Sequence, residues 1–430
     1  MGRWLAAVGL VALAVAGLLL ARGGGEGRPA ASMRQATPTP TPTPTPAPQA
    51  SIEPAGITEH LRALRDAAGE DRTRAAGSPG DAATARYIAG RLRAAGLRVS
   101  EQRFRVPLFL ERSPARVSGL RRSQFLALTF SGSGRAAGPV RRVGLGCARS
   151  DYAGLRRGDV ALARRGVCTF ASRARLAQRA GAGALLVVSD RGAPFSGSLA
   201  RPGVRIPVLA VGTRAGGELR GRVRVRVDAI SARRVTRNVI GEAGPEDAER
   251  VFMAGAHLDS VAAGPGMNDN GSGVAAVLEV AEQLATRPLP DGAALRVGFW
   301  GAEEIGLVGS RRYADRLGRA ERRRIRAYLN LDMVGSPGER AAVYAGDGEQ
   351  GRAIEAALRE ELPPNAPEER LGGSSDHAAF AAVGIPVGGL FTGLDRCYHR
   401  ACDRIGNVDA ALAASAARAT AGALVALAER

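Results

Sequence analysis

Three short apolar runs in the second half of the chain constrain its fold most strongly. They span residues 251–256, 295–300 and 327–331, and turn residues bound each of them. Continuous apolar runs of this length are typical of strands buried on both faces, as in parallel sheets covered by helices. Between the first two runs, apolar residues recur at helical spacing over 273–285. This alternation predicts an α/β fold with a doubly wound, mixed but mostly parallel sheet.

Imidazole and carboxylate side chains follow these runs and the turns near them. In open α/β sheets, sites form at the rim where strands end, so we expect these side chains to gather there. Zinc accepts imidazole nitrogen and carboxylate oxygen, and a catalytic zinc keeps one position open. Five such ligands are too many for one open ion and suit two ions that share a carboxylate. The sixth residue, which is acidic, is then left for proton transfer. The set is His257, Asp269, Glu303, Glu304, Asp332 and His399.

Each of these residues also has an ordinary explanation when taken alone. A single histidine at a strand end is more often a core or loop residue, and neighbouring glutamates are more often a solvated face. Their joint occurrence favours the metal site, because two of the four histidines stand in contexts typical of ligands. Asp259, two residues after His257, is expected to accept the second ring N–H of that histidine. The alternative for Asp259 is a turn-capping role.

The motifs around these residues resemble the co-catalytic di-zinc aminopeptidase family, which is typified by a secreted streptomycete leucine aminopeptidase. The resemblance covers roughly residues 51–110 and the chain from 233 onward. Its motifs stand in the family's order: His257-Leu258-Asp259-Ser260, Asn268-Asp269-Asn270-Gly271-Ser272-Gly273, Asn330-Leu331-Asp332-Met333, Gly388-Gly389-Leu390-Phe391 and Cys397-Tyr398-His399.

The resemblance implies a role for each matching residue. His257 and Asp332 would hold one zinc, Glu304 and His399 the other, and Asp269 would bridge them. Glu303 is the implied general base. The remaining implied roles concern substrate: Tyr398 would hydrogen-bond the developing oxyanion, the segment around Ser374 would help Glu303 and Asp332 to hold a free amine, and Phe391 would form an apolar pocket wall. Ordinary core packing is the alternative for Phe391 and Tyr398.

Two further positions qualify the resemblance. His377 is an additional histidine near the site, but the implied ligand set is already complete, so a loop or supporting role is predicted for it. Only three residues separate Gly393 from Cys397, fewer than in the streptomycete enzyme. The preferred substrate side chain is therefore left open.

An insertion of different character interrupts the peptidase-like parts. Residues 158–170, a predicted helix over 171–180 and the apolar run 181–188 resemble a protease-associated (PA) domain, a non-catalytic module thought to cover clefts or sort substrates. We predict peptidase parts over 51–110 and 233–430, and a β-rich α/β insertion over 111–232. Helices are expected over 57–65, 81–97 and 410–428, and a strand over 99–106. Alternating Arg and Val over 222–227 predicts a strand with one basic face, interpreted as a solvated edge rather than a polyanion site.

The N-terminus predicts export. A short basic start precedes an apolar run over 4–21, so residues 1–22 form a signal peptide or an uncleaved anchor. Residues 23–50, rich in Thr-Pro repeats, are expected to be an extended spacer. We predict a secreted protein, or one tethered to the outer face of the cytoplasmic membrane or to the cell wall.

The four cysteines fit an oxidising compartment. Cys397 and Cys402 would close a small loop around His399, and Cys147 and Cys168 a larger one. A structural zinc site is disfavoured, because no two cysteines show the spacing of such a site.

The chain is basic, with 60 arginines and no lysine against 41 acidic residues, a formal charge of +19. Nucleic acid is disfavoured as a partner, because arginines occur in every segment and aromatic residues make up only 4%. The charge could still favour acidic envelope polymers.

Together these features predict an exported aminopeptidase that uses two Zn2+ ions, with calcium as an optional modulator. Its substrates would be peptides with a free N-terminus and an apolar first residue, and a monomer is expected. The alternatives are a carboxypeptidase or dipeptidase of the same superfamily and, further away, a non-catalytic envelope-binding protein. Glutaminyl cyclisation is disfavoured because those relatives use a single zinc.

Overall fold

The computed structural model describes residues 51–430 except 288, 291 and 371. The predicted signal or anchor over 1–22 and the spacer over 23–50 therefore lie outside the described residues.

A parallel block of four strands carries the C-terminal half of the chain. It consists, in spatial order, of β12 (Val387–Phe391), β10 (Ile325–Leu331), β8 (Val251–His257) and β9 (Ala294–Trp300). The short strand β11 (Ala342–Ala345) borders β12 in antiparallel orientation. Every residue of β8 and β9 is buried. Burial on both faces explains why the three predicted runs are apolar throughout, and the predicted fold class is confirmed.

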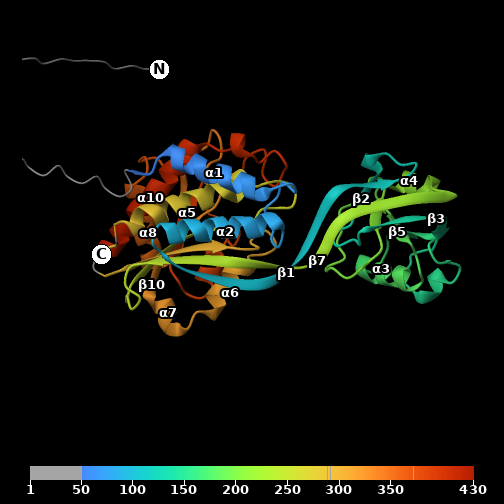
Figure 1. Cartoon of the computed structure of the whole chain (residues 1–430), viewed down its shortest axis with the longest axis horizontal. Coiled ribbons are helices and arrows are strands. Elements are labelled where there is room, and N and C mark those ends of the chain that lie inside the picture. The colour runs from blue at the N-terminus through green and yellow to red at the C-terminus, as the bar shows by residue number, and fades with distance from the viewer. Residues whose placement is uncertain (1–50, 288, 291, 371) are drawn as a thin grey trace, which may run out of the picture. The chain divides into compact units, whose positions relative to one another are not determined.

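Helices cover both faces of this block, as Figure 1 shows. One face shares a single apolar cluster with five helices: α1 (Pro54–Ala68), α2 (Pro79–Ala94), α5 (Gly273–Ala285), α8 (Gly348–Glu360) and α10 (Ala410–Glu429). The other face packs against α6 (Val308–Arg316) and the short α9 (His377–Ala381), and α7 (Arg319–Arg324) precedes β10. The predicted α5 bounds are those observed.

Local sequence signals set the ends of the N-terminal helices. Both α1 and α2 have proline in the first turn, where the missing N–H is harmless. The Ser78 hydroxyl caps α2 by accepting a hydrogen bond from the Asp81 backbone N–H. Gly96 follows α2 at φ 87°, a conformation that favours glycine, and the chain then enters β1.

The last helix, α10, is long and apolar enough by composition to cross a membrane. It nevertheless contacts α8, α5 and α1, and most of its residues are buried in the main apolar cluster. Its many alanines have short side chains, so neighbouring helices can approach closely. The helix is therefore part of the core.

Two long strands link the parallel block to the insertion. They are β1 (Arg98–Val117) and β7 (Arg222–Ala243), which pair in antiparallel orientation over most of their length. The C-terminal end of β7 pairs with β9, and its N-terminal end pairs with β3. Both strands run through the predicted domain boundaries at 110/111 and 232/233, so those boundaries remain predictions.

The interpretation of 222–227 as a solvated edge is wrong. Residues of this segment pair with β1 on one side and with β3 on the other, for example Arg226 with both Arg116 and Arg135. The alternation itself is real, because the valines are buried and the arginines point away from the core. Periodicity reports which face is buried and carries no information about the partners of a strand. The predicted strand over 99–106 is likewise only part of β1.

The insertion is a smaller α/β unit. Its strands are β2 (Phe125–Ala127), β3 (Gly134–Arg142), β4 (Val160–Arg164), β5 (Ala184–Val188) and β6 (Val208–Val211), of which β3 to β6 are parallel neighbours. Its helices are α3 (Phe170–Arg179) and α4 (Thr213–Glu218). Two apolar clusters lie on the two faces of this sheet. The predicted helix over 171–180 is α3, displaced by one residue.

Candidate metal centre

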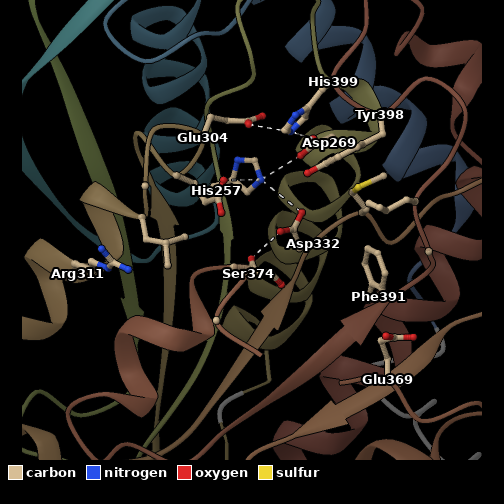
Figure 2. A pocket seen from close by; sticks show the side chains of 18 residues that line it. His257, Asp269, Glu304, Arg311, Asp332, Glu369, Ser374, Phe391, Tyr398 and His399 are labelled. Carbon is tan, nitrogen blue, oxygen red and sulfur yellow. Dashed lines mark hydrogen bonds and ion pairs between the residues drawn. The ribbon is translucent and has the colours of Figure 1, made fainter. Parts of the chain in front are cut away.

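Parallel strands bring the predicted residues to one rim of the sheet. His257 is the last residue of β8, Asp332 directly follows β10, and Glu303 and Glu304 lie in the loop after β9. These three strands are neighbours, so their carboxyl ends lie side by side. Asp269 lies in a wide turn over Met267–Ser272 that leads into α5. Figure 2 shows that His399, from the loop after β12, joins this cluster.

The first group of close ligand atoms surrounds the His257 ring. Its Nε2 atom lies 3.3 Å from Asp269 Oδ1 and 3.5 Å from Asp332 Oδ1. One ligand atom from each of these three side chains lies within 4.8 Å of the other two. Three ligands with a remaining open position match a catalytic zinc site.

The second group lies on the other side of Asp269. His399 Nε2 is 3.2 Å from Asp269 Oδ2 and 3.1 Å from Glu304 Oε2, and these three side chains also have ligand atoms within 4.8 Å of one another. Asp269 thus presents one carboxylate oxygen to each histidine. A carboxylate placed in this way could bridge two ions.

The chemistry of the cluster fits a pair of cations. Glu304 Oε1 is buried without a hydrogen-bond donor within the described part of the chain, and Asp269 Oδ2 and Asp332 Oδ1 are buried and face only a histidine nitrogen, at 3.2 Å and 3.5 Å. Buried carboxylate oxygens without donors are costly unless a cation or proton compensates them. Burial raises the pKa of Glu304 to about 7, and hydrogen bonds to Asp269 and Glu304 raise the pKa of His399 to about 10. The donor set of two imidazoles and three carboxylates suits zinc.

Glu303 is held next to the two groups without belonging to either. Its Oε2 lies 4.0 Å from His257 Nε2, and its backbone N–H donates to Asp259 Oδ1 at 3.1 Å. Burial, together with the facing carboxylates of Asp376 and Asp332, raises the pKa of Glu303 to about 10. Neighbouring cations would oppose this shift, because positive charge favours the carboxylate form.

Asp259 lies close to both His257 and Glu303. The His257 Nδ1 atom is 3.2 Å from the Asp259 carbonyl oxygen and 3.6 Å from its Oδ1. The carboxylate is fully buried. This arrangement places Asp259 where it can orient the histidine through its backbone carbonyl while it holds the Glu303 segment through its side chain.

A pocket of about 720 Å³ opens over the cluster. Phe391, Ser374 and Tyr398 line it, as do Arg311 and Glu369, which sequence reasoning did not single out. The Tyr398 ring stacks on the His399 ring, with 3.8 Å between centroids. Burial and the cluster carboxylates raise the pKa of Tyr398 to about 12, so its hydroxyl stays protonated and can donate.

His377 lies outside both ligand groups. Its Nε2 lies 2.7 Å from the Gly372 carbonyl oxygen, and its ring packs against Tyr344. The neighbouring Ser375, rather than His377, reaches the cluster, because its hydroxyl donates to Asp332 Oδ2 at 2.6 Å.

Two residues support the ligand loops: Arg74, which sequence reasoning did not single out, and Asp403, which stands in the matching motif but was given no role. Arg74 is fully buried, and its guanidinium donates to the carbonyls of Leu258, Pro265 and Gly266. Asp403 accepts hydrogen bonds from the backbone N–H groups of Asn268 and Asp269. The position of Asp403 directly after Cys402 was a usable signal. Arg74 had none, because it is one arginine among 60.

The four cysteines form the two expected disulfides. Cys397 and Cys402 close the loop that carries Tyr398 and His399, with Cα atoms 5.3 Å apart. Cys147 and Cys168 join two loops of the insertion, with Cα atoms 5.8 Å apart.

Comparison with known families assigns both parts of the chain. A family model described as peptidase family M28 matches residues 238–424, and a PA domain model matches residues 136–219. The first match contains all six residues of the cluster, and the second lies within the predicted insertion.

Individual relatives agree with these matches. A probable lipoprotein aminopeptidase of Mycobacterium tuberculosis is 36% identical over 376 residues, which cover 80% of this chain and 75% of that protein. Leupeptin-inactivating enzyme 1 of Streptomyces exfoliatus is 42% identical over 192 residues, 40% of this chain and 44% of that one. The structure of a zinc aminopeptidase from Bacillus subtilis aligns with a TM-score of 0.62 at 27% identity, covering 86% of this chain and 94% of that chain.

The fold, the metal-ligand cluster and these relatives define the class as zinc metallo-aminopeptidases. The chain belongs to peptidase family M28 and carries an inserted PA domain. The resemblance inferred from the sequence motifs is thereby confirmed.

Proposed function

We propose that this aminopeptidase uses two zinc ions, held by His257 and Asp332 on one side, by Glu304 and His399 on the other, and by Asp269 between them. One observation carries the proposal: two three-residue groups of ligand atoms share the single carboxylate of Asp269. Such sharing is the arrangement that two neighbouring ions require.

Glu303 acts as the general base in this proposal. When bound, paired zinc ions lower the pKa of water and polarise a carbonyl. Glu303 accepts a proton from water as the water oxygen bonds to the scissile carbonyl carbon. It then gives this proton to the amide nitrogen as the C–N bond breaks, which leaves a free amino acid and a peptide with a new N-terminal amine. Tyr398 donates its hydroxyl hydrogen toward the oxygen that develops negative charge. Asp259 positions Glu303 through the hydrogen bond to its backbone.

Exopeptidase action follows from the binding of a free N-terminal amine in the pocket. Carboxylates of Glu303 and Asp332 attract an N-terminal ammonium group, with Ser374 on the same wall. Phe391 supplies an apolar surface, which favours an apolar first residue. Several relatives are named leucine aminopeptidases, which supports this preference.

The proposal extends to the location of the enzyme. Both disulfides support an oxidising compartment, and the name of the mycobacterial relative, a lipoprotein, supports export. We therefore place the enzyme outside the cytoplasm, secreted or tethered through its N-terminal segment. It would act as a monomer on peptides, without nucleic acid as a partner.

Replacing Glu303 tests the catalytic assignment. Glu303→Gln should keep about two zinc ions per chain and lose roughly 100-fold or more of kcat, because the amide cannot accept the proton. Glu369→Gln is the matched control, since it makes the same chemical change on an exposed residue of the same pocket. Metal content and turnover of a leucyl anilide are measured on both variants. Normal turnover by Glu303→Gln would remove the assignment.

Assays with different substrates and analysis of the bound metal test the aminopeptidase specificity and the number of zinc ions. Aminoacyl anilides should be cleaved, and amino-blocked peptides with a free C-terminus should not. The reverse pattern would establish a carboxypeptidase or dipeptidase instead. Metal analysis giving one zinc per chain would contradict the two-ion site, and calcium is added to the same assays to test modulation.

A further inference from the structure

The positive charge of the chain is concentrated in the insertion. Residues 111–232 contain 23 arginines and only six acidic residues, a net charge of +17 out of the formal +19 for the whole chain. Arginines occur in every segment, but elsewhere acidic residues balance them. An unbalanced charge on one segment indicates an electrostatic role for that segment.

Several of these arginines stand in one row across three neighbouring strands. Arg226 of β7 pairs directly with Arg116 of β1 on one side and with Arg135 of β3 on the other. Arg224 lies two residues earlier on β7 and therefore on the same face. Figure 1 shows β1, β7 and β3 running together in the insertion.

This row borders a hollow of about 810 Å³, similar in size to the pocket over the metal cluster. We call it the arginine hollow, lined by Arg116, Arg135, Arg224, Arg226, Leu120 and Phe125. Leu120 is half-buried beside the hollow, whereas Phe125 is packed into the apolar core of the insertion and adds little exposed surface.

The charges in the arginine hollow are poorly compensated. Arg226 lies 3.4 Å from Asp228, but Arg116, Arg135 and the Arg224 side chain have no ion pair or side-chain hydrogen bond within the described part of the chain. Like charges placed directly opposite on neighbouring strands are destabilising. An anionic ligand would relieve that repulsion and could accept paired N–H bonds from each guanidinium group.

We infer that the arginine hollow binds an acidic peptide segment that also carries apolar side chains. Carboxylates match the arginines, and the half-buried Leu120 offers an apolar contact that a bare phosphate polymer would leave unused. The chain's own N-terminal segment is a poor occupant, because residues 1–50 contain a single acidic residue, Glu26. A second copy is disfavoured as well, since each copy carries +19. This site is separate from the metal cluster and does not depend on the proposed catalytic mechanism.

Direct binding to the full chain tests the inference. The probe is a fluorescent, N-terminally acetylated octapeptide in which Glu alternates with Leu, so that it offers no free amine to the metal cluster. The triple variant Arg116→Gln, Arg135→Gln, Arg224→Gln should weaken its binding by roughly tenfold or more, because three charge-assisted contacts are lost. Added salt should weaken binding to the unmodified protein.

The matched control removes the same charge from isolated positions. Arg105, Arg175 and Arg201 are exposed and lie on separate elements, so Arg105→Gln, Arg175→Gln, Arg201→Gln should change the affinity by less than about threefold. The hollow variant should keep normal leucyl anilide turnover and melt no lower than the unmodified protein, since it loses like-charge repulsion.

Five outcomes decide the matter. A selective loss in the hollow variant supports the site. An equal loss of peptide affinity in both triple variants overturns the site and indicates binding by the overall positive charge. Unchanged affinity in both variants overturns the site as well. Equal affinity for the same peptide with Gln in place of Glu also overturns it. If inorganic polyphosphate binds more tightly than the peptide and loses affinity in the hollow variant alone, the peptide assignment is wrong and the occupant is a phosphate polymer.

Discussion

At the scale of single residues, the turns that carry the metal-binding side chains contain left-handed backbone conformations that non-glycine residues seldom adopt. Ala302 precedes Glu303 at φ 63°, Met333 follows Asp332 at φ 50°, and His399 itself stands at φ 57°. A non-glycine residue held in this region costs on the order of 1–3 kcal/mol and persists only where its surroundings fix it. Three such residues at one cluster indicate that the ligand positions are imposed by tertiary contacts.

Arg74 provides one of those contacts, and its removal should loosen the ligand loops. Arg74→Met would leave the Leu258 and Pro265 carbonyls without a donor and the Gly266 carbonyl with only the Gly271 N–H, so we expect a loss of about 3 kcal/mol in the free energy of unfolding. Zinc affinity should fall too, because Leu258 and Gly266 lie next to or near His257 and Asp269. Denaturation by urea and zinc titration measure both effects. Arg86→Met, an exposed change on α2, is the control, and equal stabilities of the two variants would refute this role.

At the scale of elements, the close approach of α6 to the loop after β9 places both glutamates. Asn238 of β7 links the two, since its amide donates to the Gly309 carbonyl and its Oδ1 accepts from the Gly301 N–H. A Cβ atom at Gly309 would collide with Asn238 Oδ1 and the Gly301 carbonyl oxygen. Only glycine therefore fits at this point of α6 without displacing the loop that carries Glu303.

Gly309→Ala should consequently move the Glu303 loop. Overpacking of this kind costs about 1–3 kcal/mol in stability. A displacement of about 1 Å at a catalytic group can reduce turnover roughly 100-fold, so we expect a large fall in kcat. Gly318→Ala is the control, because a Cβ atom there meets nothing within 4 Å. The explanation fails if both variants turn over leucyl anilide at the normal rate.

The two disulfides should differ in what they support. Cys397→Ser with Cys402→Ser frees the loop of Tyr398 and His399, so zinc affinity should fall roughly 10- to 100-fold, as for other lost supporting contacts. Cys147→Ser with Cys168→Ser should instead lower the stability of the insertion by about 2–5 kcal/mol and leave zinc affinity unchanged. Zinc titration and thermal melting of both double variants separate these effects. Equal zinc affinities would contradict the expected role of the first disulfide.

At the scale of the whole molecule, the metal cluster ties together segments that are far apart in the chain. The proposed ligands come from the ends of β8 and β10, the turn before α5, the loop after β9 and the disulfide loop. Zinc bound to this folded arrangement and not to the unfolded chain must stabilise it by mass action.

Removing zinc should therefore lower the melting temperature. At a free zinc concentration about 100-fold above Kd, each site contributes about 2.7 kcal/mol, so chelation should reduce stability measurably and added zinc should restore it. Calorimetry with and without chelator tests this. Asp269→Asn, which removes the shared ligand, should melt at nearly the same temperature in both conditions. A chelator-insensitive melting temperature for the unmodified protein would show that the cluster does not hold zinc in the folded state.

The sequence by itself determined the strands of the parallel block, the helix α5 and the identity of the cluster residues. A strand that is buried on both faces is a continuous apolar run, and zinc ligands belong to a few residue types. Both features can therefore be recognised in the sequence without knowing which segments are in contact. The PA domain was predicted from the resemblance of residues 158–188, and the disulfides from four cysteines in a predicted oxidising compartment.

Only the tertiary structure decided how these parts combine. It revealed Arg74 as a support of the ligand loops, moved 222–227 from an edge to the interior of the sheet, and set Arg116, Arg226 and Arg135 in one row. Each of these facts depends on contacts between segments that are far apart in the sequence. Strand β7 pairs with residues of β1 and β3 that are more than 80 positions away, and Arg74 contacts a loop more than 180 positions away. Side-chain periodicity records which way a residue faces, whereas its neighbours across a sheet or a core are fixed only when the whole chain folds.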